Sequence, residues 1–328
     1  MQPRRKAILI SLIVSILLMI TKFVAYFLTN SNAILTDATE SIVNVVASSF
    51  AFYSIYLSTL PRDLNHPYGH GKVEFFSAFL EGLLILIAGI IIIANSIYGL
   101  VNPPVIDHLS TGTLILSATG LVNLLTGLYL INQGKKHRSI TLYADGKHLL
   151  TDTYTSIALI IGLIFILITG KLWLDNVFSI LAGMYLIFSG YKLVRTSVGG
   201  LMDESDEKVI VNIVSVLQNN RRDEWIDVHN LRAQQYGPDM HIDCHVTLPY
   251  YYDLAKVHQE ISDIDKLINA STPHNIEFFI HADPCLPECC HYCKVKKCPV
   301  RKETFTGEIE WTQKNTRLNQ KHFMHELF

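Results

Sequence analysis

The stretch EFFSAFLEGLLILIAGIIIIANSIYGLV at residues 74–101 decides the fold, because it is apolar over nearly its whole length. A helix needs about 20 apolar residues to cross a bilayer, and this stretch exceeds that length. Working outward, similar apolar segments occupy residues 7–29, 33–58, 112–133, 140–168 and 172–197. The sequence therefore predicts an α-helical membrane domain of six transmembrane helices.

The composition changes along the chain of 328 residues, which is 49% hydrophobic and 17% charged overall. Apolar runs stop near residue 200, and charged residues are frequent afterwards. We therefore expect a transmembrane domain at 1–202, a cytoplasmic domain at 203–284, and a Cys-rich segment with a polar tail at 285–328. The net charge of −2 argues against a nucleic-acid partner. No GxxxxGK[ST] loop occurs, so the sequence indicates neither nucleotide binding nor an enzyme.

The distribution of basic residues predicts the orientation in the bilayer. Lys and Arg precede the first span and lie in the loops after the second and fourth spans, whereas the loops after the first and third spans contain none. Since basic loops stay in the cytoplasm, both termini should be cytoplasmic, in a multi-pass protein of the bacterial inner (plasma) membrane. The first apolar run follows MQPRRK without an obvious cleavage site, so we expect a retained span and not a signal peptide.

Two of the predicted spans each carry a pair of metal-ligand side chains four residues apart. These pairs are Glu40 with Asn44 in the second span, and His148 with Asp152 in the fifth. Residues at this spacing lie on one face of a helix. If the two faces oppose each other, the four side chains surround one point, as in a four-coordinate divalent metal site.

A less specific interpretation exists for part of this set. A single polar residue such as Asn44 often only forms a hydrogen bond to a neighbouring membrane helix. Three ionisable groups at a similar depth are harder to explain in that way, because each is costly inside a bilayer. Asp37 and Asp145 lie near the same pairs and could support the ligands or line a vestibule. The whole pattern favours a metal transporter.

A second candidate metal site lies in the loop PRDLNHPYGHGKVEFFSA after the second span. Asp63, His66 and His70 follow one another at intervals of three and four residues, and Pro and Gly between them favour a tight turn. The alternative is that these histidines are solvated or form only local hydrogen bonds.

The cytoplasmic domain has the pattern of a small α+β fold. An amphipathic helix opens it, and two strands, a second helix and a third strand follow. The corresponding sequences are SDEKVIVNIVSVLQNN, WIDVHNLRAQQYG, DMHIDCHVTL, YYDLAKVHQEISDIDKLINAS and HNIEFFIHAD.

With the paired ligands, the motif HPYGHGKVE, the six spans and the ending IHADPC, the chain resembles the cation diffusion facilitator family of divalent-metal/proton antiporters. The resemblance implies that Glu40, Asn44, His148 and Asp152 form the transport site, and that Asp63, His66 and His70 form a loop site. It also implies a metallochaperone-like, ferredoxin-like cytoplasmic domain that forms a homodimer and binds metal through His229, His245, His258, His281 and Asp283.

Asn44 departs from the family pattern, since many zinc-transporting members have aspartate there. The four-residue site then contains only two carboxylates, and a neutral amide oxygen replaces a third. The imidazole of His148 favours zinc, iron, cobalt or nickel over magnesium and calcium. We expect Zn²⁺ first and Fe²⁺ second as substrate and structural ligand, and His148 places Mn²⁺ below both.

The chain departs from the family pattern a second time in its cysteine-rich segment. Five of the six cysteines fall within residues 285–298, and cytosolic cysteines at this density indicate metal binding, not disulfides. A structural zinc ion, an iron–sulfur cluster, or a loop of reduced thiols would each suit the spacing. The candidate ligands are Cys285, Cys290, Cys293 and Cys298.

Together these patterns predict a homodimeric transporter that exports Zn²⁺ or Fe²⁺ from the cytosol in exchange for protons across the lipid bilayer. The alternative is a membrane-anchored metal sensor or a non-transporting dimer partner. Two features motivate that alternative. The neutral Asn44 weakens the intramembrane metal site, and the cysteines add metal ligands on the cytosolic side.

Overall fold

A computed structural model of the chain describes residues 2–29, 32–101, 109–169, 173–272 and 275–324. The chain divides into two compact units, Met1–Leu201 and Met202–Phe328. The division agrees with the composition change near residue 200.

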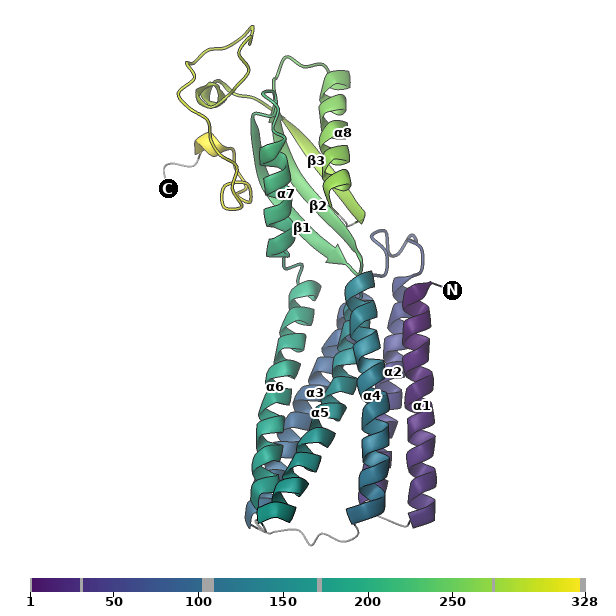
Figure 1. The fold of residues 1–328 in the computed structure, drawn as a ribbon. Helices are drawn as coiled ribbons and strands as arrows, with labels where there is room; N and C mark the ends of the chain where they lie inside the picture. The colour runs from purple at the N-terminus through teal and green to yellow at the C-terminus, as the bar shows by residue number, and fades with distance from the viewer. Residues whose placement is uncertain (1, 30–31, 102–108, 170–172, 273–274, 325–328) are drawn as a thin grey trace. The chain divides into compact units, whose positions relative to one another are not determined.

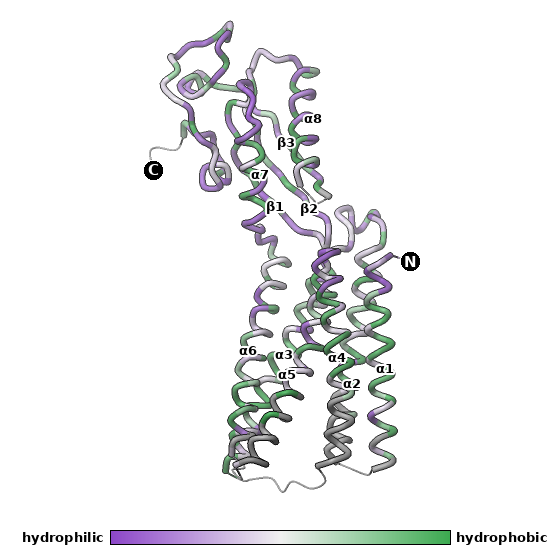
Figure 2. Tube along the Cα trace, in the orientation of Figure 1, coloured by the Kyte–Doolittle hydropathy of each residue, from purple (hydrophilic) through white to green (hydrophobic). Residues whose placement is uncertain are grey.

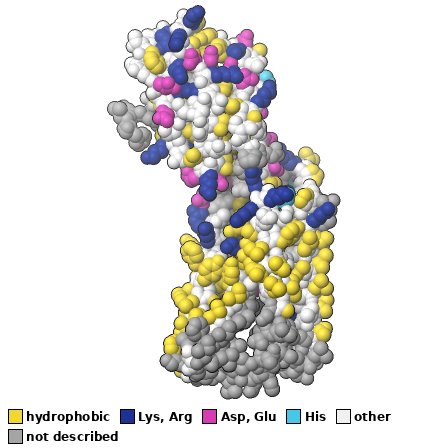
Figure 3. Space-filling view, viewed as in Figure 1, with side chains coloured by type: hydrophobic (Ala, Val, Ile, Leu, Met, Phe, Trp, Pro, Cys, Tyr) yellow, Lys and Arg dark blue, Asp and Glu magenta, His cyan; other side chains and the backbone are white. Residues whose placement is uncertain are grey.

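The first unit consists of six long helices that correspond to the six predicted spans (Figure 1). They are α1 (Pro3–Thr29), α2 (Asn32–Ser58), α3 (Val73–Val101), α4 (Leu109–His137), α5 (Ile140–Thr169) and α6 (Trp173–Leu201). In the described residues, stretches of α1, α2, α3 and α6 are long and apolar enough to cross a membrane. Hydrophobic residues run along α1 (Figure 2), and hydrophobic side chains form a broad band over the described part of this unit on the face in Figure 3. Such an outer surface suits contact with lipid.

Close glycine contacts pair the helices of this unit. α4 packs on α5, and a Cβ atom added at Gly127 would lie 2.9 Å from the carbonyl oxygen of Gly146. α3 packs on α6 in the same way, through Gly89 and Gly183. Small residues let membrane helices approach closely, where van der Waals contacts replace the hydrophobic effect. The glycines of α4 therefore fix the position of α5, which carries two of the predicted metal ligands.

A buried polar network ties the helices together around Glu74, the second residue of α3. Its carboxylate forms an ion pair of 2.6 Å with Arg4 in α1 and accepts hydrogen bonds from Ser58 in α2, at 3.0 Å, and from Ser139, which precedes α5. Because a buried charge is costly without a partner, this network stabilises one arrangement of the four segments.

The second unit has the element order that the sequence predicts. It contains α7 (Glu207–Asn219), β1 (Asp227–Tyr236), β2 (Asp239–Leu248), α8 (Leu254–Ser271) and β3 (Asn275–Pro284). The sheet has the order β1-β2-β3, with β2 antiparallel to β1 and parallel to β3. Its core is formed by apolar residues of the sheet and of both helices, with Ile213 of α7 and Ile264 of α8 fully buried.

The tail after β3 folds onto this unit, which its polar composition does not predict. Trp311 is buried in the core, and the guanidinium of Arg221 lies 4.1 Å from the centre of its ring. The backbone of the tail also pairs with β1, since Asn230 and Leu231 donate hydrogen bonds to the carbonyls of Leu318 and Thr316. The tail thereby covers part of an otherwise exposed sheet edge. It includes two short 3-10 helices, η1 (Pro287–His291) and η2 (His322–Met324).

Candidate metal sites

Three of the four predicted intramembrane ligands meet between α2 and α5. The side-chain amide of Asn44 lies between the other two: its Nδ2 donates to Asp152 Oδ2 at 2.8 Å, and its Oδ1 lies 3.0 Å from His148 Nε2. Asn44 and His148 are buried. Glu40 lies one turn before Asn44 on α2, but its side chain is outside the described residues. The pattern of two opposed i, i+4 pairs thus brings Asn44, His148 and Asp152 to one point.

Glu81 is a fourth polar group at this point that the sequence analysis missed. It lies on α3 and is 1% exposed, and its Oε2 is 3.7 Å from Nδ1 of His148. Among the described residues, neither of its carboxylate oxygens has a hydrogen-bond partner. The signal was present in the sequence, because a glutamate within an apolar span is costly and marks a functional site by default.

Asp145 lies near this ligand cluster and forms hydrogen bonds to two other helices. It is fully buried one turn before His148 on α5, and it accepts hydrogen bonds from Ser11 of α1 at 2.6 Å and from Ser48 of α2 at 3.1 Å. Its carboxylate therefore links three helices. The side chain of Asp37 lies outside the described residues.

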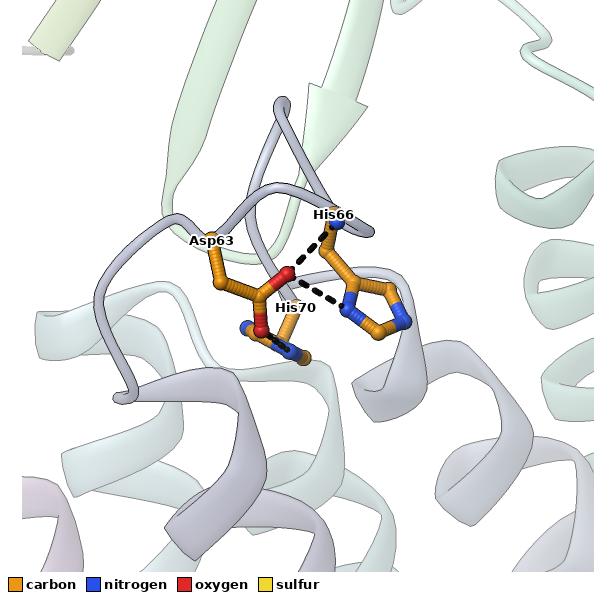
Figure 4. Close-up of side chains that lie close together, drawn as sticks. All are labelled: Asp63, His66 and His70. Atoms are coloured by element: carbon orange, nitrogen blue, oxygen red, sulfur yellow. Dashed lines mark hydrogen bonds and ion pairs between the residues drawn. The ribbon is translucent and has the colours of Figure 1, made fainter.

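The loop between α2 and α3 brings Asp63, His66 and His70 together (Figure 4). Asp63 Oδ1 accepts the backbone N–H of His66 at 2.7 Å and lies 3.0 Å from His66 Nδ1, while its Oδ2 lies 3.4 Å from His70 Nε2. The backbone hydrogen bond from His66 holds the pKa of Asp63 below its ordinary value. Gly69 makes the turn possible with a φ of +89°. An ionised carboxylate and two imidazoles within 4.8 Å of one another have the geometry to bind a divalent metal.

In the second unit, strand register creates a row of histidines. His229 of β1 pairs with His245 of β2, which pairs with His281 of β3. Directly paired residues project from the same face of a sheet, and so does Asp283, two residues after His281. The sheet therefore gathers four of the five residues that the resemblance assigns to this domain.

Distances within this group suit a metal site. Asp283 Oδ2 lies 3.2 Å from His229 Nε2 and 3.2 Å from His245 Nδ1, and Asp283 Oδ1 lies 3.6 Å from His281 Nε2. The His229 side chain is 5% exposed and that of His281 is 66% exposed, so the group opens from the core to the surface. The ligand atoms of His229, His245 and Asp283 all lie within 4.8 Å of one another, and His281 falls outside that compact group. His258 lies on an exposed part of α8, also outside it, and stays a prediction.

Asp227 supports His229 from behind, and the sequence analysis did not identify it. It is fully buried, with Oδ1 at 3.3 Å from His229 Nδ1, and its Oδ2 accepts a hydrogen bond of 2.9 Å from the hydroxyl of Tyr292. Burial alone would raise the pKa of Asp227, but the neighbouring His229 and His322 side chains lower it below its ordinary value. A carboxylate behind a histidine fixes the orientation of the ring and leaves the opposite nitrogen free to bind metal.

The cysteine-rich segment lines a cavity of about 100 Å³. Its walls include all four predicted ligands, Cys285, Cys290, Cys293 and Cys298, together with Cys289. Burial raises the pKa of the Cys285 and Cys293 thiols and raises the pKa of the adjacent Tyr251 to about 12.

Comparison with known protein families agrees with this architecture. Residues 8–202 match the family model of the cation efflux transmembrane domain, and residues 205–285 match that of the cation efflux protein cytoplasmic domain. With its apolar helices, the chain is a multi-pass membrane protein.

Several curated relatives align with most of the chain. An uncharacterized transporter of Synechocystis is 31% identical over 247 residues, which cover 75% of this chain and 80% of the relative. The manganese efflux system protein MneP of Bacillus subtilis is 29% identical over 295 residues, covering 88% and 98%. The cation-efflux pump FieF of Cronobacter sakazakii is 25% identical over 284 residues, covering 85% and 92%. The chain therefore belongs to the cation diffusion facilitator family of cation efflux transporters.

Proposed function

We propose that this transporter exports Zn²⁺ or Fe²⁺ from the cytosol in exchange for protons. It acts as a homodimer in the bacterial inner membrane, with both termini in the cytoplasm. The observation that carries the proposal is the meeting of Asn44, His148 and Asp152 inside the helical unit, with Glu81 beside them. Three helices supply these groups, so a relative movement of the helices can open the site to either side of the membrane.

The substrate ion would take the place of hydrogen bonds between the ligands. In the structure, the amide nitrogen of Asn44 forms a hydrogen bond to Asp152, and its amide oxygen forms one with His148. A metal at this point would be bound by the amide oxygen, by the Asp152 carboxylate and by the imidazole, with Glu40 completing the site from one turn away on α2. The nitrogen ligand favours zinc and ferrous iron. The name of the Bacillus relative nevertheless makes Mn²⁺ a necessary competitor to test.

Glu81 offers a third carboxyl group, which Asn44 does not supply. When Nε2 of His148 binds a metal, the proton on the ring must be at Nδ1, which faces Glu81 at 3.7 Å. The carboxylate would orient this ring and stabilise its Nδ1–H, as carboxylates do behind many metal-bound histidines. Metal binding would release a proton from the His148–Glu81 pair, and protons from the opposite side would return to the pair and displace the metal.

The two cytosolic clusters would bind metal without carrying it across the membrane. The Asp63 group lies in the loop between α2 and α3, and the His229 group lies in the unit that matches the cytoplasmic-domain family. We propose that the second unit forms the homodimer, and that metal bound at its histidine row stabilises the dimer. His258 would join that site only in the dimer.

Metal-driven proton flux in proteoliposomes tests the proposal. Wild-type protein and the Asp152→Ala variant would be reconstituted and supplied in turn with Zn²⁺, Fe²⁺, Mn²⁺, Co²⁺ and Cd²⁺. We expect proton movement opposite to metal movement, with Zn²⁺ or Fe²⁺ most effective, and none from the variant. Wild-type flux in Asp152→Ala would contradict the assigned site, and a folded dimer that moves no metal would favour the sensor alternative.

A further inference from the structure

The strongest feature outside the transport machinery is the cysteine-lined cavity of the tail. Apart from Cys285 at the boundary, its cysteines lie beyond residue 285, where the match to the cytoplasmic-domain family ends. Its walls come from the chain just after β3, from η1, from the loops that follow η1, and from Ile226 and the turn at 249–251. The family resemblance therefore does not account for it.

Hydrogen bonds within the chain order the backbone around the cavity. One arginine, Arg301, donates hydrogen bonds to the carbonyls of Cys290, Cys293 and Val295, at 3.0, 2.9 and 2.9 Å. Cys285 continues the pairing of β3, because its N–H donates to the carbonyl of Leu248 at 2.9 Å. A single side chain that satisfies three carbonyls joins η1 to the loop that follows it.

The cysteines line the cavity, and their sulfur atoms do not form a compact group. Among the described residues, the metal-compatible groups with all ligand atoms within 4.8 Å of one another are those of Asp63 and His229, and the cysteines form no such group. The backbone N–H of Tyr250 lies 3.4 Å from Cys285 Sγ, a donor position that stabilises a thiolate. Arg301 and Lys302 add positive charge to the wall, which would offset the negative charge of four thiolates.

We propose that Cys285, Cys290, Cys293 and Cys298 form a tetrathiolate metal centre that holds the tail against the cytoplasmic unit. Thiolates bind soft and borderline metals, so the occupant is either one Zn²⁺ ion or an iron–sulfur cluster. With Zn–S distances of about 2.3 Å, tetrahedral zinc would draw the sulfurs to about 3.8 Å from one another, which requires the loop to contract. A cluster of several iron atoms bridges sulfurs that are further apart.

The centre also connects to the histidine row through one side chain. Tyr292 lies next to Cys293, and its hydroxyl donates to Asp227, the carboxylate behind His229. Occupation of the tetrathiolate centre would thus fix Tyr292, and through it the orientation of His229. This link rests on the proposed metal binding by the histidine row, whereas the tetrathiolate centre does not depend on the transport function.

Metal content of the full-length protein, purified anaerobically in detergent, tests the centre. We expect wild type to retain tightly bound zinc, or iron together with acid-labile sulfide and visible absorption. Cys293→Ser should lose that metal, whereas Cys244→Ala, which removes the thiol in β2 outside the cavity, should keep it. Zinc without sulfide would identify the single-ion centre, and iron with sulfide would identify the cluster.

Two measurements keep the test independent of variant folding and of transport. Wild type reconstituted with Co²⁺ should show intense sulfur-to-cobalt charge-transfer absorption if four thiolates bind one ion. Wild type that retains neither zinc nor iron, and in which the four proposed ligand thiols all react with an alkylating reagent in the native state, would overturn the proposal. For the link, Tyr292→Phe should keep the tetrathiolate metal but weaken metal binding at the histidine row. Unchanged binding there would refute the link alone.

Discussion

Glu81→Gln is the most informative single change, because it removes one ionisable carboxyl group beside the proposed transport site and nearly preserves the side-chain shape. At the observed 3.7 Å, a full charge pair between Glu81 and His148 would be worth about 4 kcal/mol at an effective dielectric constant of about 20. Desolvation of both groups offsets much of this energy. Loss of a carboxylate behind a metal-binding histidine typically reduces metal affinity or activity by about 10- to 100-fold.

We therefore expect the metal concentration for half-maximal flux in Glu81→Gln to rise by about 10- to 100-fold, equivalent to about 1.4–2.7 kcal/mol. The assay is metal-driven proton flux in proteoliposomes, measured over a range of metal concentrations and at several pH values. The number of protons moved per metal should also fall, because the neutral amide cannot share a proton with His148. The exposed Glu303→Gln serves as the matched control and should match wild type.

A folded Glu81→Gln variant with wild-type metal dependence and wild-type proton coupling would refute this reasoning. In that case Glu81 would be only a buried carboxylate near the site. A variant that binds metal normally but moves fewer protons would restrict the role of Glu81 to proton transfer and exclude any effect on affinity.

Two further predictions concern stability. Glu260 is buried, accepts hydrogen bonds from Trp225 and Arg222, and forms an ion pair with Lys256. Glu260→Gln should therefore reduce the free energy of unfolding by about 2–3 kcal/mol, measured by urea titration followed by tryptophan fluorescence. Burial alone would raise the pKa of Glu260, but these partners lower it below its ordinary value. The difference in unfolding free energy between wild type and variant should therefore be full above about pH 5 and disappear as the pH falls through the lowered pKa. A difference that does not change with pH would contradict this reasoning. Gly127→Ala should lower thermal stability in detergent by about 1–3 kcal/mol, because the added Cβ would meet the backbone of α5 at 2.9 Å. Gly307→Ala, with nothing within 4 Å of the added atom, should have no effect, and equal stability of the two variants would show that α4 and α5 can separate without cost.

Much of the architecture could be predicted from local patterns. Span length and hydropathy predicted the six helices, since the bilayer sets the length that a helix must have. The i, i+4 spacing predicted that Asn44 shares a helix face with Glu40, and His148 with Asp152. Period-two alternation and turn residues predicted the order of the cytoplasmic elements. Each of these inferences depends on residues that are near one another in the chain.

Relations between distant segments could not be predicted in this way. The approach of Glu81 to His148 depends on how α3 packs against α5, and that packing is determined by helix contacts far apart in sequence. The support of His229 by Asp227 and Tyr292 likewise joins β1 to a tail more than sixty residues away. Neither contact has a periodicity or spacing that reveals it.

The sequence by itself determined the membrane helices, the ligand pairs on α2 and α5, and the cysteine spacing, because hydrophobicity and short-range spacing are properties of a single element. The tertiary structure decided which ionisable groups lie beside His148, which strand register aligns the three histidines, and how the tail pairs with the edge of β1. The physical reason is that close packing and strand pairing select one arrangement among many that local preferences permit equally.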